Sequence, residues 1–385
     1  MDTNDLLTLI ALGEDSQTQF KADISRSESL AQEMVAMSNG QGGRILIGVN
    51  DDGTIAGLDN QDISRLNQLV SNASTEHMRP PIAPTTQNFN FEQGMVMVVH
   101  IAEGVSKPYM DKHLHVYVKS GADKRKVVAR EELQRIFQQN ALVHADELVV
   151  KNSSINDLDS AYFEQFFEKA YGESLEQTAM PLTTLLENMN LMHQGQLNYA
   201  GTLLFAKKPQ IRLPMFMIKA VAFYGNDITD EQYIDSRDIT GKLADIFSEA
   251  LSFCLINIRH VQNNQSVNSI GEPEIPKIVF EELIANALIH RDYFISAPIN
   301  LLIFQNRIEI ISSGHLPNNL TIENIKMGNS NIRNPILASF ASKVLPYRGL
   351  GSGILRALKA YPNIELIDDR ENNRFKAIIY RKNLS

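Results

Sequence analysis

Three polar side chains with complementary chemistry recur at four-residue intervals within residues 275–293. They are Glu282, Asn286 and His290, and the apolar residues between them recur at helical spacing, so all three should follow one stripe of a helix. A carboxylate there could act on water while a carboxamide holds a cation. The alternative is an ordinary amphipathic helix whose polar flank is solvated.

Two glycine-containing turns follow this stretch. ISSGHLP (311–317) leaves an expected strand and turns at Gly314, and RGLGSGI (348–354) opens an expected helix. Glycines let backbone N–H groups approach an anion, and the N-terminal dipole of a helix favours phosphate. The order of helix, strand-turn and glycine loop is more informative than a glycine run alone.

Taken together, EELIANALIHRDY, RIEIISSGHLP, RNP at 333–335 and GLGSGI resemble the divergent GHKL-type ATPase domain of bacterial proteins often labelled as RecG-like helicases or transcriptional regulators. The resemblance covers roughly 210–370 and implies an α/β sandwich that uses ATP and Mg²⁺. It implies that Glu282 activates water and that Asn286 ligates Mg²⁺. It maps the glycine loop onto Gly349, Gly351 and Gly353. The full set of nucleotide-binding residues we predict is Asn286, His290, Arg291, Gly314, Arg348, Gly349, Gly351, Ser352 and Gly353.

The adenine loop departs from that family. Its usual form is D-x-G-x-G, with an aspartate that reads the adenine amino group, whereas the corresponding turn here is SSGHLP. The chain also contains no P-loop, G-x-x-x-x-G-K-[ST], so a helicase reading has no support in the sequence. We therefore expect a nucleotide sensor, with ATP hydrolysis left open.

A second resemblance lies in the N-terminal part. QFKADIS, SNGQGGRILIGVNDDGTIAGL and HVYVKSG are similar to the Schlafen-type, Alba-like nucleic-acid-binding domain, over about 14–135. Nuclease members of that family use two glutamates five residues apart and an aspartate after the IGV strand. The matching positions here are Glu14, Gln19 and, among the residues after IGV, Asp51. Replacing a carboxylate by an amide weakens binding of the divalent ions that activate water, so binding without cleavage is favoured over a metal-dependent nuclease.

Contact with a phosphate backbone requires cations, which bind without reading sequence. The basic residues concentrate around the KSGADKRK turn, and the alternative is a solvated basic turn beside acidic residues. His113 and His115 would share one face of an expected strand. The nucleic-acid-binding residues we predict are Lys21, Lys107, Lys119, Lys124, Arg125 and Lys126.

Composition sets bounds on these readings. The 385 residues, 43% hydrophobic and 21% charged, suffice for two or three domains. A net charge of −9 argues against a protein that coats nucleic acid indiscriminately, although a local basic face remains compatible with it. One cysteine, Cys254, excludes an internal disulfide, and the N-terminus does not resemble a signal peptide. A cytoplasmic protein without a membrane segment is expected.

The elements that must position these residues form an α+β protein in three parts. Residues 1–140 alternate helices and strands, and Ser25 with Glu28 is expected to cap the helix that precedes GGRILIGV. Residues 141–211 read as a helical, winged-helix-like bridge. Residues 212–385 contain the site helix, two strands joined by a short turn and a terminal hairpin.

The function expected from both parts is an ATP-binding, nucleotide-gated nucleic-acid-binding protein, as in a transcriptional regulator or a defence component. The alternatives are a metal-dependent nuclease that uses the N-terminal carboxylates and a catalytically inactive scaffold. The GHKL resemblance also implies a homodimer. Sequence alone does not choose between DNA and RNA.

Overall fold

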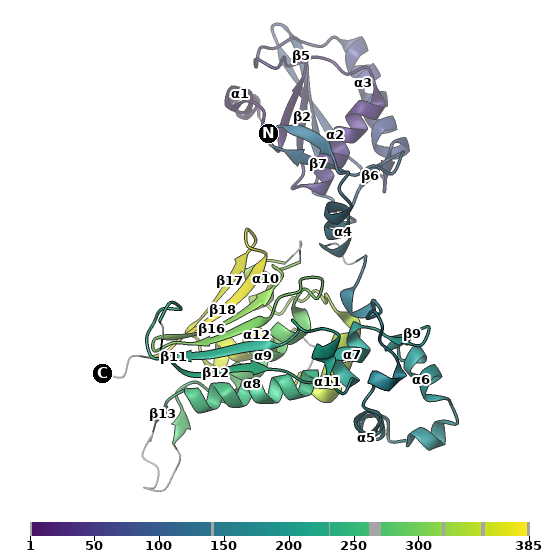
Figure 1. The fold of residues 1–385 in the computed structure, drawn as a ribbon. Helices are drawn as coiled ribbons and strands as arrows, with labels where there is room; N and C mark the ends of the chain where they lie inside the picture. The colour runs from purple at the N-terminus through teal and green to yellow at the C-terminus, as the bar shows by residue number, and fades with distance from the viewer. Residues whose placement is uncertain are drawn as a thin grey trace. The chain divides into compact units, whose positions relative to one another are not determined.

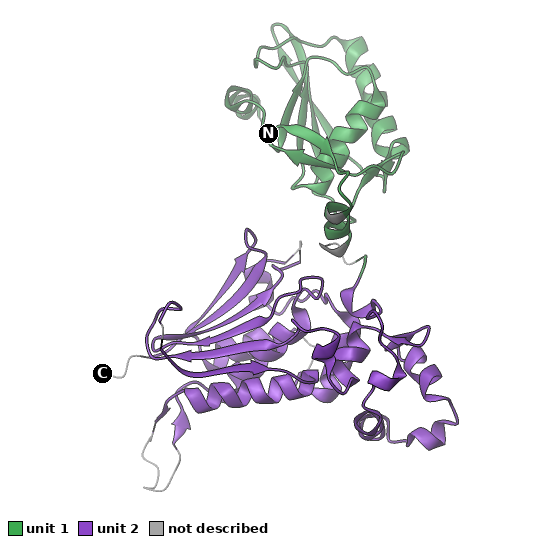
Figure 2. Cartoon of the chain, viewed as in Figure 1, with its two compact units in different colours: residues 1–143 green, residues 144–385 purple. Residues whose placement is uncertain are grey.

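The chain forms two compact units. In the computed structural model the boundary falls between Val143 and His144 (Figure 2). Helices and strands are mixed in both units, which confirms the α+β class. The three-part division at residues 140 and 211 stays a prediction, and residues 144–211 pack within the second unit. The structure describes residues 2–139, 142–230, 232–261, 271–317, 320–347 and 351–382.

The first unit is organised around a four-stranded sheet in the order β1-β2-β5-β4 (Figure 1). Strands β1 and β2 are parallel and the other pairs are antiparallel. The central ILI run of β2 is fully buried because apolar clusters cover both faces of the sheet. The strands are β1 (Thr18–Lys21), β2 (Gly43–Ile47), β4 (Thr85–Phe91) and β5 (Gly94–Ile101).

Helices and short hairpins complete this unit. Helices α2 and α3 contribute to the apolar cluster on one face of the sheet, and α1 contributes to the cluster on the other. The remaining elements are α1 (Thr3–Leu12), α2 (Ser27–Asn39), α3 (Asn60–Glu76), β3 (Met78–Arg79), β6 (Met110–Asp111), β7 (Tyr117–Ser120), β8 (Asp123–Lys126) and α4 (Arg130–Gln139).

The expected cap of α2 was wrong. Helix α2 begins at Ser27, and Arg26 occupies the N-cap position without a side-chain hydrogen bond. Glu28 pairs with Lys112 instead of completing a capping box, because the Lys112 ammonium lies beside it. The basic stretch Asp123–Lys126 is also a strand paired with β7, where a turn was expected.

The second unit is organised around a six-stranded sheet in the order β12-β11-β15-β16-β18-β17. Strands β11 and β15 are parallel and their neighbours are antiparallel. The expected terminal hairpin is β17–β18, whereas edge strand β12 was not foreseen. The strands are β11 (Ile218–Phe223), β12 (Tyr233–Ile239), β15 (Ile299–Ile303), β16 (Arg307–Ser313), β17 (Ile364–Asp369) and β18 (Arg374–Tyr380).

Helices α8 and α9 lie side by side against this sheet, and α12 packs on α9 (Figure 1). No helix in the described part of the chain is long and apolar enough to cross a membrane. The further elements of this unit are α5 (Ser160–Tyr171), α6 (Leu182–Asn188), β9 (Met192–His193), β10 (Gln196–Leu197), α7 (Tyr199–Phe205), α8 (Leu243–Asn257), β13 (His260–Val261), β14 (Glu272–Pro273), α9 (Lys277–His290), α10 (Ile322–Lys326), α11 (Pro335–Val344), α12 (Gly353–Ala360) and the 3₁₀ turns Ala145–Glu147, Ile155–Asp157, Leu175–Thr178 and Pro209–Ile211.

The first residues of the second unit are fixed to the start of α11. Asp146 is fully buried, and one of its carboxylate oxygens accepts the backbone N–H of Leu337 at 2.9 Å. His144 Nδ1 lies 3.0 Å from the carbonyl of Arg333. Burial raises the pKa of Asp146 to about 6, although the backbone donors of α11 favour its charged form.

This buried carboxyl group predicts a pH-dependent stability. Because its pKa in the folded state is raised, the folded protein keeps a proton between about pH 4 and pH 6 that the unfolded chain has released. The unfolding free energy should therefore fall as the pH rises through that window. Asp146→Asn should gain about 2 kcal/mol at pH 7.5 and almost nothing at pH 4. Urea unfolding at both pH values measures this, with exposed Glu147→Gln as the matched control. An equal effect at both pH values would contradict it.

Candidate nucleotide site

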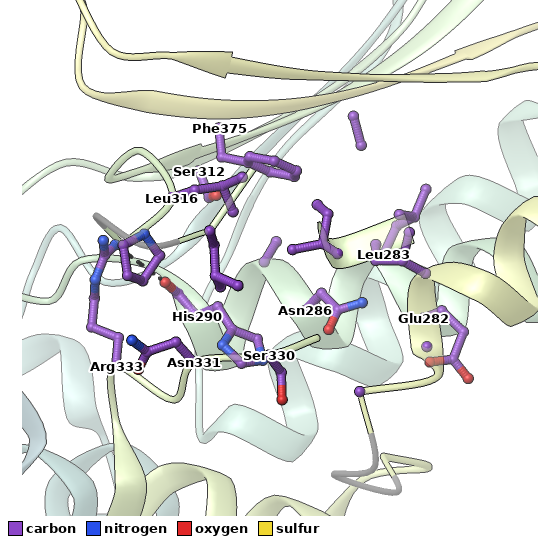
Figure 3. A pocket seen from close by; sticks show the side chains of 18 of the residues that line it. Glu282, Leu283, Asn286, His290, Ser312, Leu316, Ser330, Asn331, Arg333 and Phe375 are labelled. Atoms are coloured by element: carbon purple, nitrogen blue, oxygen red, sulfur yellow. Dashed lines mark hydrogen bonds between the residues drawn. The ribbon is translucent and has the colours of Figure 1, made fainter. Parts of the chain in front are cut away.

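A pocket lies in the second unit between α9, strands β16 and β18, and the first turn of α12 (Figure 3). Its cavity volume is about 110 Å³, or about 1020 Å³ when the open solvent at its mouth is included. Glu282, Asn286 and His290 all line it, so the four-residue spacing does place them along one wall. Apolar side chains from the sheet and helix, including Ile310, form the opposite surface.

Glu282 is already engaged within this wall. Its side chain is only 2% exposed, and its Oε1 lies 2.6 Å from Nη2 of Arg356 on α12. A Cβ at Gly353 would come within 2.5 Å of Glu282 Oε2, so a larger residue there would have to displace the end of the Glu282 side chain. In this structure Glu282 is therefore the buried half of an ion pair that joins α9 to α12, and the Arg356 side chain is 28% exposed.

Asn286 offers a polar group to the pocket. Its Nδ2 is buried and makes no hydrogen bond within the described part of the chain. Buried polar groups rarely remain unpaired, so such an atom marks a place where a ligand could bind. The Asn286 side-chain oxygen also has the chemistry to ligate Mg²⁺, which keeps several waters and takes phosphate oxygens as further ligands. The donor set thus fits Mg²⁺ arriving with a nucleotide better than an all-protein metal cage.

His290 and Arg333 form the far end of the pocket. His290 Nε2 lies 3.1 Å from the Tyr347 hydroxyl, and burial together with the charge of Arg333 lowers the His290 pKa to about 4. The imidazole is therefore neutral at pH 7. Arg333 donates to the carbonyl of His315 at 2.7 Å, which fixes its guanidinium beside the pocket. This supplies a fixed positive charge.

The glycine turns lie where the sequence placed them, as far as the structure describes them. Gly314 has φ 94°, and a Cβ there would come within 2.7 Å of Asp292 Cβ. Gly351, Ser352 and Gly353 line the pocket at the start of α12. Arg348 and Gly349 lie outside the described residues. The backbone N–H groups of the first turn of α12 are the phosphate-binding feature that remains.

Arg291 is the predicted nucleotide-binding residue that the structure directs elsewhere. It is 2% exposed, does not line the pocket, and donates to the carbonyl of Ala297. Its guanidinium lies over the rings of Phe216 and Tyr293, at 4.8 and 5.0 Å from their centroids. The helix ends at His290, and the next residue turns into the core.

Among the pocket residues that sequence reasoning missed are Arg333, Tyr347 and Arg356. Arg333 belongs to the RNP motif but had been given no role. Arg356 lies three residues after Gly353, and this helical spacing could have placed it above the same wall. No sequence motif around Tyr347 indicated that it would line the pocket.

The N-terminal carboxylate positions form a different kind of cluster. Glu14 Oε1 accepts the Gln19 amide and, at 2.6 Å, the backbone N–H of Phe20. Lys119 donates to Gln19 Oε1 at 2.9 Å, so an ammonium group stands at this cluster. Within the described residues no hydrogen bond or ion pair joins Asp51 to Glu14 or Gln19.

Most of the cations predicted to bind nucleic acid are already occupied. Lys107 donates to the Gly40 carbonyl and to Glu103, both at 2.7 Å, and Lys119 is nearly buried. The ion pairs of the next two are Lys124 with Glu33 at 2.8 Å and Arg125 with Glu132 at 2.5 Å. Lys21 and Lys126 make no side-chain hydrogen bond or ion pair within the described part of the chain.

Two families match separate parts of the chain. The family described as "Schlafen, AlbA_2" matches residues 14–128, and "Putative ATP-dependent DNA helicase recG C-terminal" matches residues 296–376. The resemblance to a Schlafen-type domain joined to a divergent ATPase domain is therefore confirmed. The RecG-type region contains Gly314, Arg333 and the start of α12, but it begins after α9. A comparison with curated proteins found no match.

Solved structures also resemble parts of the chain. The DIP2311 protein from Corynebacterium diphtheriae is 20% identical with a TM-score of 0.46, over 98% of this chain and 80% of that one. The N-terminal domain of a putative ATP-dependent DNA helicase RecG-related protein from Nitrosomonas europaea is 21% identical with a TM-score of 0.23, over 34% of this chain and 96% of that one.

Because Arg356 pairs with Glu282, removing a positive charge from α12 should lower stability much more at Arg356 than at Lys359. Arg356→Met should lower the unfolding free energy by about 1.5–3 kcal/mol, because it removes a charged partner from a buried carboxylate. Adding Glu282→Gln to this variant should recover most of the loss. Lys359→Met, on the exposed part of the same helix, should change stability by less than about 0.5 kcal/mol. Urea unfolding measures all four proteins, and equal losses from Arg356→Met and Lys359→Met would contradict the role of the pair.

Proposed function

We propose that the pocket of the second unit binds a purine nucleoside triphosphate with Mg²⁺, and that its occupancy controls nucleic-acid binding by the Schlafen-type unit. The RecG-type and Schlafen-type matches support ATP-related and nucleic-acid-related roles in the two parts. The observation that carries the proposal is the Nδ2 of Asn286, which is buried and has no hydrogen-bond partner among the described residues, in a pocket that also has an arginine and a helix N-terminus.

The phosphates would lie at the α12 end of the pocket. There the backbone N–H groups after Gly353 and the side chains of Asn286 and Arg356 gather around one place. When bound, Mg²⁺ would bridge phosphate oxygens and neutralise part of their charge. The base would lie against the apolar surface that includes Ile310, Phe375 and Ala377. Ser312, at the edge of that surface, is a hydroxyl and does not select adenine as a carboxylate would.

Turnover depends on Glu282, and Glu282 is paired with Arg356. Triphosphate would offer Arg356 a second anion and so compete for it. Until that exchange occurs, Arg356 stabilises the carboxylate charge and so makes Glu282 a weaker base toward an attacking water. The site therefore favours sensing of nucleotide over fast hydrolysis.

A chain of contacts within the second unit connects the pocket to His144, the first residue of that unit. Arg333 lines the pocket, and its own carbonyl contacts His144. His144 is the first residue of the second unit, and Asp146 fixes the same segment to α11. A nucleotide that shifts Arg333 would thus act directly on the residues that follow the unit boundary.

The first test is binding itself. Isothermal titration of the full chain with ATP and with GTP in MgCl₂ should give saturable heats, with weak discrimination between the two bases. Asn286→Ala and Gly353→Ala should each weaken binding at least about tenfold, since each loses or displaces a phosphate contact. Asn188→Ala, on exposed α6, is the matched control. Absence of heat and of thermal stabilisation by either nucleotide would refute the site.

The second test separates coupling from binding. Fluorescence anisotropy should show that ATP changes the affinity of the full chain for a labelled oligonucleotide several-fold. His144→Ala should keep ATP affinity but lose most of that change, because it removes the contact to Arg333. His193→Ala, at the exposed end of β9, should behave as wild type. Coupling that survives in His144→Ala would exclude this path.

A further inference from the structure

A second cleft lies wholly within the Schlafen-type unit. It measures about 210 Å³ and is bordered by α2, by the residue that ends α3 and by the segment from β6 to β8. Its polar lining is rich in nitrogen donors: His77, Lys112, His113, His115 and Lys126. The cluster of Glu14 and Gln19 does not contribute to this lining.

The segment 111–115 is built around one carboxylate. Asp111 is 4% exposed and accepts the backbone N–H groups of His113 at 2.8 Å and His115 at 2.9 Å. Its second oxygen lies 3.3 Å from His115 Nδ1. Burial by itself would raise the pKa of Asp111, but these donors hold it below the ordinary value. The segment is therefore held in one conformation, and the charge of Asp111 is used internally.

The sequence expectation of two histidines on one strand was wrong in its geometry. His113 lies in a turn before β7, and Leu114 has φ 62°. The turn nevertheless brings the two rings within 6.0 Å of each other, measured between centroids. A strand would have been extended at Leu114, so the Asp111-centred turn is what sets this spacing.

The nitrogen donors of this cleft are more available than those of the neighbouring strands. Lys126 is exposed and makes no side-chain hydrogen bond or ion pair with the described residues. His77 Nδ1 is buried and unpartnered within the described part of the chain, while its Nε2 lies 3.1 Å from the Ser27 hydroxyl. The second carboxylate of the cleft, Glu28, is paired with Lys112. Both acids in the cleft thus already have partners.

We propose that this cleft binds a backbone phosphate of a nucleic-acid strand, through Lys126 and the imidazoles of His77 and His113. A compact set of N–H donors around one small cleft suits a single phosphate group. A metal ion fits less well, since the described residues contain no group of three or more His, Cys, Asp or Glu suited to hold one. The inference rests on the nucleic-acid part of the proposed function and is independent of the nucleotide pocket.

This assignment also relocates the expected interface. Four of the six predicted cations are occupied by protein partners, whereas Lys126 opens on the cleft. A phosphate contact here would fix the position of the strand without reading its bases. Lys126 in the cleft would then supply the positive charge for phosphate binding that the paired lysines cannot supply.

The test uses full-length protein and fluorescence anisotropy with labelled single-stranded DNA and RNA of about 20 nucleotides, over a salt series. Lys126→Ala/His113→Ala should weaken binding at least about tenfold and reduce the slope of log K against log salt by about one. Lys126→Arg should retain most of the affinity. Arg44→Ala/His100→Ala removes a cation and an imidazole from a different cleft of the same unit and should change affinity less than about twofold.

The measured affinities and salt slopes distinguish phosphate binding in this cleft from binding elsewhere on the protein. Unchanged affinity and slope in Lys126→Ala/His113→Ala, with thermal unfolding like wild type, overturns it, and so does an equal loss in the control pair. Histidine-ring NMR with inorganic phosphate separates the sources of phosphate: ring shifts with free phosphate, combined with unchanged oligonucleotide affinity, also overturn it. If the wild type binds no oligonucleotide, this proposal and the coupling fail while nucleotide binding still stands.

Discussion

The buried pair of Glu282 and Arg356 is the interaction on which the second unit depends most. It joins α9, which carries the polar stripe, to α12, which begins at the glycine loop. Because Gly353 has no side chain, the start of α12 lies directly against the carboxylate and Asn286. The wall of the pocket is thus one packed assembly, in which the position of α12 is set by a charge on α9.

The sequence predicted the local elements of this site and the residue spacing on α9. Helical periodicity and glycine positions depend on neighbouring residues, so they could be read directly. The ion pair of Glu282 with Arg356 was not predicted, because Arg356 lies 74 residues farther along the chain and only its spacing from Gly353 pointed to the same wall. Arg291 shows the complementary limit. Its place in a polar motif suggested a ligand contact, whereas the end of α9 turns it onto two aromatic rings. Edge strand β12 was missed because its YIDSRDI sequence is largely polar.

The Schlafen-type unit gives a similar lesson about charge. Counting lysines near a basic stretch identified the right part of the chain, but it could not tell which ammonium groups were already paired. Acidic residues from α2 and α4 occupy Lys124 and Arg125. The turn that contains His113 and His115 was not among the cations predicted to bind nucleic acid, yet Asp111 holds its backbone and the turn lines the same cleft as the exposed Lys126. Whether a lysine or arginine can bind a phosphate therefore depends on which acidic residues the fold places beside it.

The close approach of α12 to α9 at Gly353 also determines how the charges of the pocket respond to a ligand. With Glu282 2% exposed, the carboxylate is poorly tolerated alone in the protein interior. A ligand that draws Arg356 away removes a positive charge from beside the Glu282 carboxylate, so the exchange is favoured when the ligand brings a proton or a divalent ion. A polyanion without its counter-ion would leave two negative groups facing each other across α12. Nucleotide and cation would then enter as one neutralising unit, and the pocket would respond to the complex more than to either component.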